Sequence, residues 1–96
     1  MSSVYDIIVR PLETEKAYLL REQGKYVFIV QLYANKLEVK RAVEEIYGVD
    51  VDDVHTMVMP GKMNRMRGRR ATARRAPWKK AVVTLAPGER IEALEA

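Results

Sequence analysis

Apolar residues recur at helical spacing in residues 36–47. Five of them fall at i, i+3, i+4, i+7 and i+8 and so share one face of a helix: Val39, Ala42, Val43, Ile46 and Tyr47. Asn35 and Glu38 have the spacing of a capping box at the helix start. Gly48 stands where a helix commonly ends in the left-handed conformation. The pattern predicts an amphipathic helix over 36–47.

Shorter apolar runs predict the strands. Residues 25–33 are apolar at both alternating sets of positions, which is typical of a central strand covered on both sides. Residues 49–59 and 78–85 also read as strands, and each is followed by proline and glycine. Residues 5–9 form a brief apolar run stopped by Arg10-Pro11, which predicts a short edge strand.

A second helix is predicted within residues 12–24, which are rich in helix formers and end at Gly24. Thr14 is its candidate cap, and its apolar side is formed by Ala17, Leu20 and Tyr18. Residues 90–96 predict at most one terminal helical turn.

These elements follow one another as strand, helix, strand, helix, strand, long connection, strand. A helix between two strands is expected to make a right-handed parallel crossover, whereas the last two strands are expected to pair antiparallel. We therefore predict an α+β fold. It is a small two- to three-layer sandwich, with a mainly antiparallel sheet, a central amphipathic helix and a long basic hairpin loop, in a single domain over 1–96.

The connection at residues 61–77 is much longer than a usual hairpin loop of 2–5 residues. It has no apolar periodicity, so it is not expected to fold alone by burying surface. Long connections of this kind are usually functional or disordered.

Charge is distributed unevenly along the chain, whose formal net charge is +4. Residues 60–80 hold nine Lys or Arg and no acid. The remaining residues hold eight Lys or Arg against all thirteen Asp and Glu, a net charge of −5. An acidic body with a strongly basic segment indicates a polyanionic partner for that segment.

Nucleic acid is the polyanion that the basic segment fits best, because arginine grips phosphate oxygens bidentately and stacks on bases. Trp78 offers a stacking face beside the ammonium groups of Lys79 and Lys80, although it is equally a candidate core anchor of the last strand. Lys36 and Lys40, one turn apart on the central helix, either extend the phosphate-binding face or are solvated partners of Glu44. The candidate binding residues are Lys36, Lys40, Lys62, Arg65, Arg67, Arg69, Arg70, Arg74, Arg75, Trp78, Lys79 and Lys80.

Catalytic and metal chemistry find little support. There is no cysteine, and the single histidine, His55, sits in a strand pattern where a structural role is the better interpretation. Asp50, Asp52 and Asp53 cluster without the spacing of a calcium loop, so a solvated turn is expected. No phosphate-binding glycine motif is present, and a likeness to acylphosphatase-type enzymes would rest on fold alone. We predict no enzymatic activity, no cofactor and no metal.

The chain start has no signal-peptide pattern, and no window is long and apolar enough to span a bilayer. We therefore expect a cytoplasmic protein with no membrane partner, and we expect no homo-oligomer. The first turn of the predicted helix at 12–24 is acidic at Glu13 and Glu15. These acids either complement the helix dipole or form an exposed docking point for a basic partner protein.

The sequence resembles the bacterial members of the large-subunit ribosomal protein twenty-three family over nearly its whole length. The resemblance is carried, in this order, by RPLETEKAY, ANKLEVKRAVEEIYGV, VDDVHTMVMPGK, the arginine-rich loop and WKKAVVTLAPGERIEAL. It implies an α+β fold with an antiparallel sheet and a structural role in the large ribosomal subunit. A free nucleic-acid-binding regulator is the alternative, although no recognition-helix pattern supports it.

The resemblance also implies partners. Family members bind large-subunit rRNA near the exit of the polypeptide tunnel, beside neighbouring ribosomal proteins, and their long loop reaches toward the tunnel wall. Their outer surface docks trigger factor and the signal recognition particle. The acid of the family's Ser-Glu-Lys motif corresponds to Glu15 in Thr14-Glu15-Lys16, with Glu13 beside it.

Overall fold

A four-stranded antiparallel sheet forms the centre of the protein. The computed structural model describes residues 4–61, 63–65, 72–74 and 76–94. Strand order across the sheet is β1-β2-β6-β3, and each neighbouring pair is antiparallel. The strands are β1 (Ile8–Pro11), β2 (Lys25–Val30), β3 (Val51–Met59) and β6 (Trp78–Leu85).

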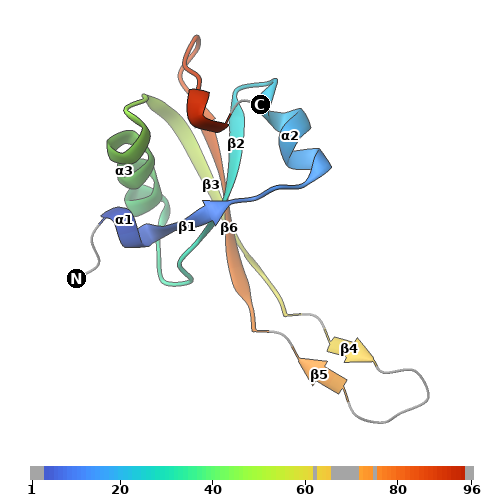
Figure 1. Cartoon of the computed structure of the whole chain (residues 1–96). Coiled ribbons are helices and arrows are strands. Elements are labelled where there is room, and N and C mark those ends of the chain that lie inside the picture. The colour runs from blue at the N-terminus through green and yellow to red at the C-terminus, as the bar shows by residue number, and fades with distance from the viewer. Residues whose placement is uncertain (1–3, 62, 66–71, 75, 95–96) are drawn as a thin grey trace.

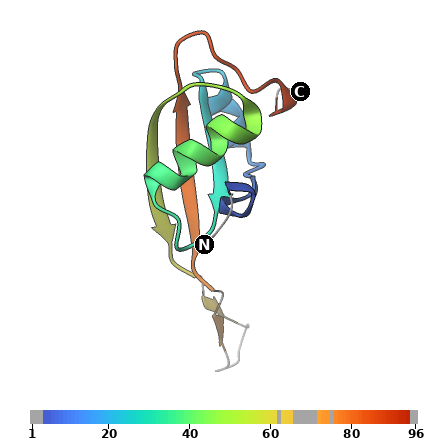
Figure 2. The same cartoon turned by 90° about the vertical axis from the view of Figure 1, so that its left-hand side faces the viewer.

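Helices cover both faces of this sheet. Figure 1 shows α3 on one side of the sheet and α2 on the other, and Figure 2 shows α3 lying across the near face. The described helices are α1 (Val4–Ile7), α2 (Glu15–Arg21), α3 (Lys36–Tyr47) and the 3-10 turn η1 (Glu92–Leu94). The arrangement confirms the predicted α+β sandwich. Within the described part of the chain, no helix is long and apolar enough to cross a membrane.

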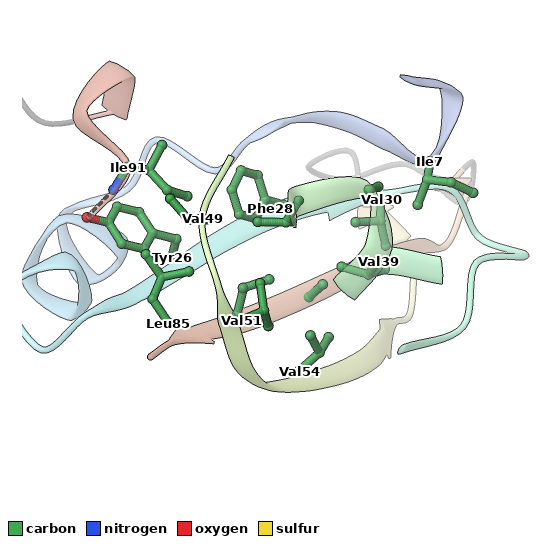
Figure 3. Packing of buried hydrophobic residues seen from close by; sticks show 14 of the residues in the cluster. Ile7, Tyr26, Phe28, Val30, Val39, Val49, Val51, Val54, Leu85 and Ile91 are labelled. Carbon is green, nitrogen blue, oxygen red and sulfur yellow. Dashed lines mark hydrogen bonds between the residues drawn. The ribbon is translucent and has the colours of Figure 1, made fainter. Parts of the chain in front are cut away.

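The hydrophobic core lies between α3 and one face of the sheet (Figure 3). Val39, Ala42 and Val43 of the predicted apolar stripe are fully buried, and Ile46 and Tyr47 are partly buried against them. Phe28 of β2 stacks on Tyr47, with ring centroids 5.8 Å apart. Burying large side chains of this kind contributes roughly 1.5–3 kcal/mol each, so this layer is the main source of stability.

Both predicted helix starts are capped as expected. Asn35 Oδ1 accepts from the Glu38 amide at 2.9 Å, and Glu38 Oε1 accepts from the Asn35 amide at 3.1 Å, which completes the capping box. Gly48 ends α3 with a φ of 66°, a left-handed conformation that costs glycine little. Thr14 Oγ1 accepts from the Ala17 amide at 3.2 Å and caps α2.

Three strand ranges differ from the prediction, and for β3 the difference is a start at Val51 instead of at residue 49. Residues 5–9 were expected to be extended, but the chain is helical through Ile7 and the edge strand runs over 8–11. The helical turn directs Ile7 into the core, where it is 2% exposed. The strand expected over 25–33 ends at Val30, because a turn follows in which the Ala34 amide donates to the Gln31 carbonyl at 3.0 Å.

The expected parallel crossover is confirmed in direction for β2-α3-β3 and wrong for β1-α2-β2. β1 and β2 pair antiparallel although α2 lies between them in sequence. β2 and β3, joined through α3, run in the same direction but do not pair, because β6 lies between them and pairs with both. Buried Ala81 and Val83 alternate with half-buried Val82 in β6, which is why this strand occupies a central position.

The basic connection has secondary structure of its own, contrary to prediction. β4 (Met63–Arg65) pairs antiparallel with β5 (Thr72–Arg74) in a separate two-stranded sheet. Backbone pairing holds these strands, so no apolar periodicity is needed. Figure 1 shows this ribbon well away from the body, beyond the ends of β3 and β6.

The capping box gives a first prediction. Replacing Asn35→Ala should lower the free energy of unfolding by about 1 kcal/mol, because the Glu38 amide loses its acceptor. Asn35→Ser keeps an acceptor oxygen and should retain most of the stability. Urea unfolding followed by circular dichroism measures both variants, and equal stability of the alanine and serine proteins would contradict the prediction.

Candidate nucleic-acid interface

The ribbon formed by β4 and β5 carries part of the predicted basic surface. Arg65 ends β4 and Arg74 ends β5, on strands paired through Met63 with Arg74 and Arg65 with Thr72. The other predicted loop residues lie outside the described residues: Lys62, Arg67, Arg69, Arg70 and Arg75. The described backbone therefore places two of the loop arginines on a structured projection.

Three predicted residues begin β6, at the base of the ribbon. Lys79 lies opposite Val30 and Val58, on the α3 side of the sheet, and its ammonium donates to the Ala34 carbonyl at 2.5 Å. Strand alternation directs Lys80 to the other side. The sequence suggested that both ammonium groups flank Trp78, but the pleat separates them.

Trp78 is partly buried and lies opposite Met59 across the β3–β6 pair. Its indole therefore packs on the sheet and still offers some surface to a partner. Partial burial agrees with the role of a core anchor, and base stacking by Trp78 stays a prediction.

Lys80 contributes to a shallow groove between α2 and the sheet, together with Lys16. The other groove residues are mostly apolar: Leu12, Thr14, Ala17, Leu20, Val27 and Val82. Lys80 is consequently positioned near α2 as well as near the ribbon.

Lys36 and Lys40 lie on α3, one turn apart. Lys36 is exposed as the first residue of α3, and Lys40 is partly buried. In Figure 2 the N-terminus of α3 lies at the end of the body from which the ribbon projects. Both lysines thus belong to the half of the molecule that contains the basic segment.

The two acidic docking candidates differ in their contacts. The Glu13 carboxylate accepts a hydrogen bond from the Tyr18 hydroxyl, and it lies 3.6 Å from Arg21 Nη2. Glu15 is exposed at the first position of α2, where its charge complements the helix dipole. The Glu13 carboxylate, which precedes α2, is held by the Tyr18 and Arg21 side chains of that helix, whereas the Glu15 carboxylate is presented to the solvent.

Arg21 is a buried cation that the sequence interpretation missed. It is 6% exposed, its Nη1 donates to the Leu94 carbonyl at 2.6 Å, and it lies 4.6 Å from the centre of the Tyr18 ring. The 3.6 Å to Glu13 is an ion-pair distance but too long for a hydrogen bond, so Nη2 relies on charge attraction alone. Its spacing of i+4 from Ala17 was the available signal that it faces inward.

Arg21 also joins α2 to the end of the described chain. Arg90 Nη1 donates to the Arg21 carbonyl at 3.0 Å, and the Ile91 amide donates to the Tyr26 hydroxyl at 3.3 Å. These bonds hold the segment before η1 against α2 and β2, as the dashed line in Figure 3 shows for Tyr26. The orientation of the acidic helix tip therefore depends on residues at both ends of the sequence.

The described residues contain no group of three or more His, Cys, Asp or Glu that could hold a metal ion. His55 is exposed on β3, and Asp50, Asp52 and Asp53 are exposed around the start of that strand. The Asp cluster is thus exposed as expected, but Asp52 and Asp53 lie in β3 and not in a turn.

The fold and the charge distribution define a class: a small α+β protein whose acidic body carries a projecting basic ribbon. The family model described as Ribosomal protein L23 matches residues 6–93, and the chain belongs to this family. The resemblance seen in the sequence is thereby confirmed. Ribosomal proteins of this kind are structural components and not enzymes, which confirms the prediction of no enzymatic activity.

Individual relatives agree with the family match over nearly the whole chain. The chain is 48% identical to the large ribosomal subunit protein uL23 of Herpetosiphon aurantiacus, over 97% of both chains. It is 47% identical to that of Heliobacterium modesticaldum, over 99% of this chain and 98% of the relative. It is 52% identical to that of Thermotoga neapolitana, over 97% of this chain and 91% of the relative.

The Glu13–Tyr18 pair gives a second prediction. The hydrogen bond to Glu13, with some burial and the carboxylate charge, raises the pKa of Tyr18, while Arg21 opposes the rise. Because the pKa of Tyr18 is raised in the folded state, this tyrosine contributes to the free energy of unfolding. The contribution is fully present at pH values below the ordinary tyrosine pKa and is lost as the pH rises through the raised pKa of the folded state. Glu13→Ala should therefore lower the pKa of Tyr18.

Tyrosine ring-carbon NMR during an alkaline titration measures this pKa. Glu15→Ala is the matched control, because it removes a carboxylate from the same helix tip and should leave the Tyr18 titration unchanged. An unaltered Tyr18 pKa in Glu13→Ala would show that the hydrogen bond does not persist in solution.

Proposed function

We propose that this protein is a structural constituent of the large ribosomal subunit that binds large-subunit rRNA near the polypeptide exit tunnel. The observation that carries the proposal is the separation of charge. Nine cations lie in residues 60–80, part of which forms a ribbon projecting from a body of net charge −5. Membership in a ribosomal protein family supports the same assignment.

The ribbon is the proposed anchor on RNA. Arginines on a narrow two-stranded projection reach phosphates on several RNA helices without bringing the acidic body close to them. The proposed contacts are Lys62, Arg65, Arg67, Arg69, Arg70, Arg74 and Arg75 in the segment, with Lys36, Lys40, Trp78, Lys79 and Lys80 at its base. Lys79 supports this base through the Ala34 carbonyl.

The tip of α2 is the proposed docking point for factors that meet the nascent chain, such as trigger factor and the signal recognition particle. Glu15 is exposed there, and Glu13 is oriented beside it by Tyr18 and Arg21. Basic residues of a factor complement these carboxylates. The protein would work in the cytoplasm on the ribosome, between rRNA and neighbouring ribosomal proteins.

Sucrose-gradient fractionation of a lysate containing tagged protein tests the assignment at low and high salt. We expect co-migration with the large subunit that persists in high salt. Protein that stays at the top of the gradient at both salt concentrations would favour the free nucleic-acid-binding regulator.

Removing arginines of the basic segment at residues 60–80 gives a third prediction. Replacing Arg69, Arg70, Arg74 and Arg75 with alanine should weaken binding to an rRNA transcript. It should also reduce the slope of log affinity against log salt by about 3, because each phosphate contact contributes roughly 0.7–0.9. The four-lysine variant is the control, since it keeps the charges. Circular dichroism should show an intact body in both, and an unchanged slope in the alanine variant would refute the ribbon as anchor.

Reversing one charge on α2 gives a fourth prediction. Glu15→Arg should leave incorporation into the large subunit intact and reduce trigger-factor binding to the purified subunits about tenfold or more, through loss of attraction and new repulsion. Glu22→Arg makes the same charge change at the other end of α2 and should have little effect. Undiminished recruitment by Glu15→Arg would exclude this tip as the docking point.

A further inference from the structure

An exposed apolar patch lies where the β2–α3 turn meets the end of β3. Four side chains form this turn patch, and all are about half exposed or more: Leu32 at 48%, Tyr33 at 58%, Leu37 at 71% and Val58 at 56%. Large apolar side chains gathered on a small protein usually mark an interaction surface.

Chain proximity and the Lys79 side chain relate the members of the turn patch to one another. Leu32 and Tyr33 lie in the turn after β2, and Leu37 lies in the first turn of α3 directly after it. Val58 pairs with Lys79 across the sheet, and the Lys79 ammonium binds the Ala34 carbonyl of the same turn. The turn is thereby tied to the start of β6, directly beside Val58 of β3.

The charged residues near the turn patch include two lysines of α3 and one exposed acid, Asp6, which lies beside the turn because the Gln31 amide donates to the Ile7 carbonyl at 2.9 Å. Lys36 is exposed and directly precedes Leu37 in the chain, and Lys40 follows one turn along α3. The nearest acid on that helix, Glu38, is occupied, since its carboxylate accepts from the Asn35 amide in the capping box. The exposed acids Glu13 and Glu15 lie on the tip of α2, across the sheet from α3. An apolar centre with lysines at its rim complements an anion that also offers non-polar surface.

The turn patch is also continuous with the proposed RNA anchor. Figures 1 and 2 show the β2–α3 turn and the N-terminus of α3 at the end of the body from which the ribbon projects. A nucleic acid held by the ribbon would pass beside this end of the body. This position favours RNA over a protein as the occupant.

We propose that the turn patch is a second RNA contact, seated in the shallow minor groove of an rRNA helix. That groove is wide in A-form RNA and displays riboses and base edges, on which aliphatic and phenolic side chains can lie. Lys36 and Lys40 would reach the phosphates on either side. This inference rests on the proposed function and adds an apolar contact to an interface whose other proposed contacts, apart from Trp78, are ionic.

Salt dependence separates this contact from the ionic ones. Leu32→Ser with Leu37→Ser should weaken binding to a large-subunit rRNA transcript about tenfold at every salt concentration, because apolar burial is lost. The slope of log affinity against log salt should not change, because no phosphate contact is removed. Lys36→Ala with Lys40→Ala should instead reduce the slope by about 1.5.

Leu19→Ser is the matched control, because Leu19 is 58% exposed on α2, away from the turn patch. It should bind the transcript as the wild type does, and circular dichroism should show that all variants are folded. Incorporation into large subunits depleted of this protein provides a second readout, in which the leucine variant should also be impaired.

Three results would overturn the inference. The leucine variant would bind the transcript normally if the turn patch had no role. It would bind the transcript normally and still fail to enter subunits if the turn patch contacts a protein. If the wild-type protein failed to bind the transcript or enter subunits, the proposed function would fall, and this inference with it.

Discussion

The pairing of β6 with two neighbours is the constraint on which the rest of the structure depends. This strand lies between β2 and β3 and is hydrogen-bonded to both, so it closes the sheet on which α3 packs. The same strand begins where the basic connection ends, which places the ribbon at one end of the body. Its pleat also sends Lys79 and Lys80 to opposite sides of the sheet. Core, ribbon position and the direction of two cations thus follow from one strand.

Separate contacts organise the end of the body near the ribbon and the face of the sheet that α2 covers. At the ribbon end, the Lys79–Ala34 hydrogen bond fastens the β2–α3 turn, with its exposed apolar side chains, beside the basic segment. On the other face of the sheet, buried Arg21 links α2 to the Leu94 carbonyl and orients Glu13 through charge and Tyr18. An acidic surface and a basic surface are thereby kept apart on a chain of 96 residues. Under the proposed function, this separation would allow one small protein to face RNA and proteins at once.

Local sequence signals predicted the elements whose stability is local. The bounds of α3 were correct because its capping box, apolar stripe and terminal glycine all lie within the helix. β6 was also correct at both ends, because proline precedes it and follows it closely. The first strand was misjudged, since only the contact of Ile7 with the core distinguishes a helical turn from an extended run there. Paired short strands in the basic connection were missed because backbone hydrogen bonds leave no apolar pattern.

The sequence by itself determined the fold class, the central helix, the concentration of positive charge in residues 60–80 and the family. These properties depend on composition and on short-range periodicity, which a single chain displays directly. Only the tertiary structure decided which side chains meet. The contacts of Lys79 with Ala34 and of Arg21 with Leu94 join residues 45 and 73 positions apart. Such contacts arise from the insertion of β6 and the return of the chain end, and no local pattern specifies them.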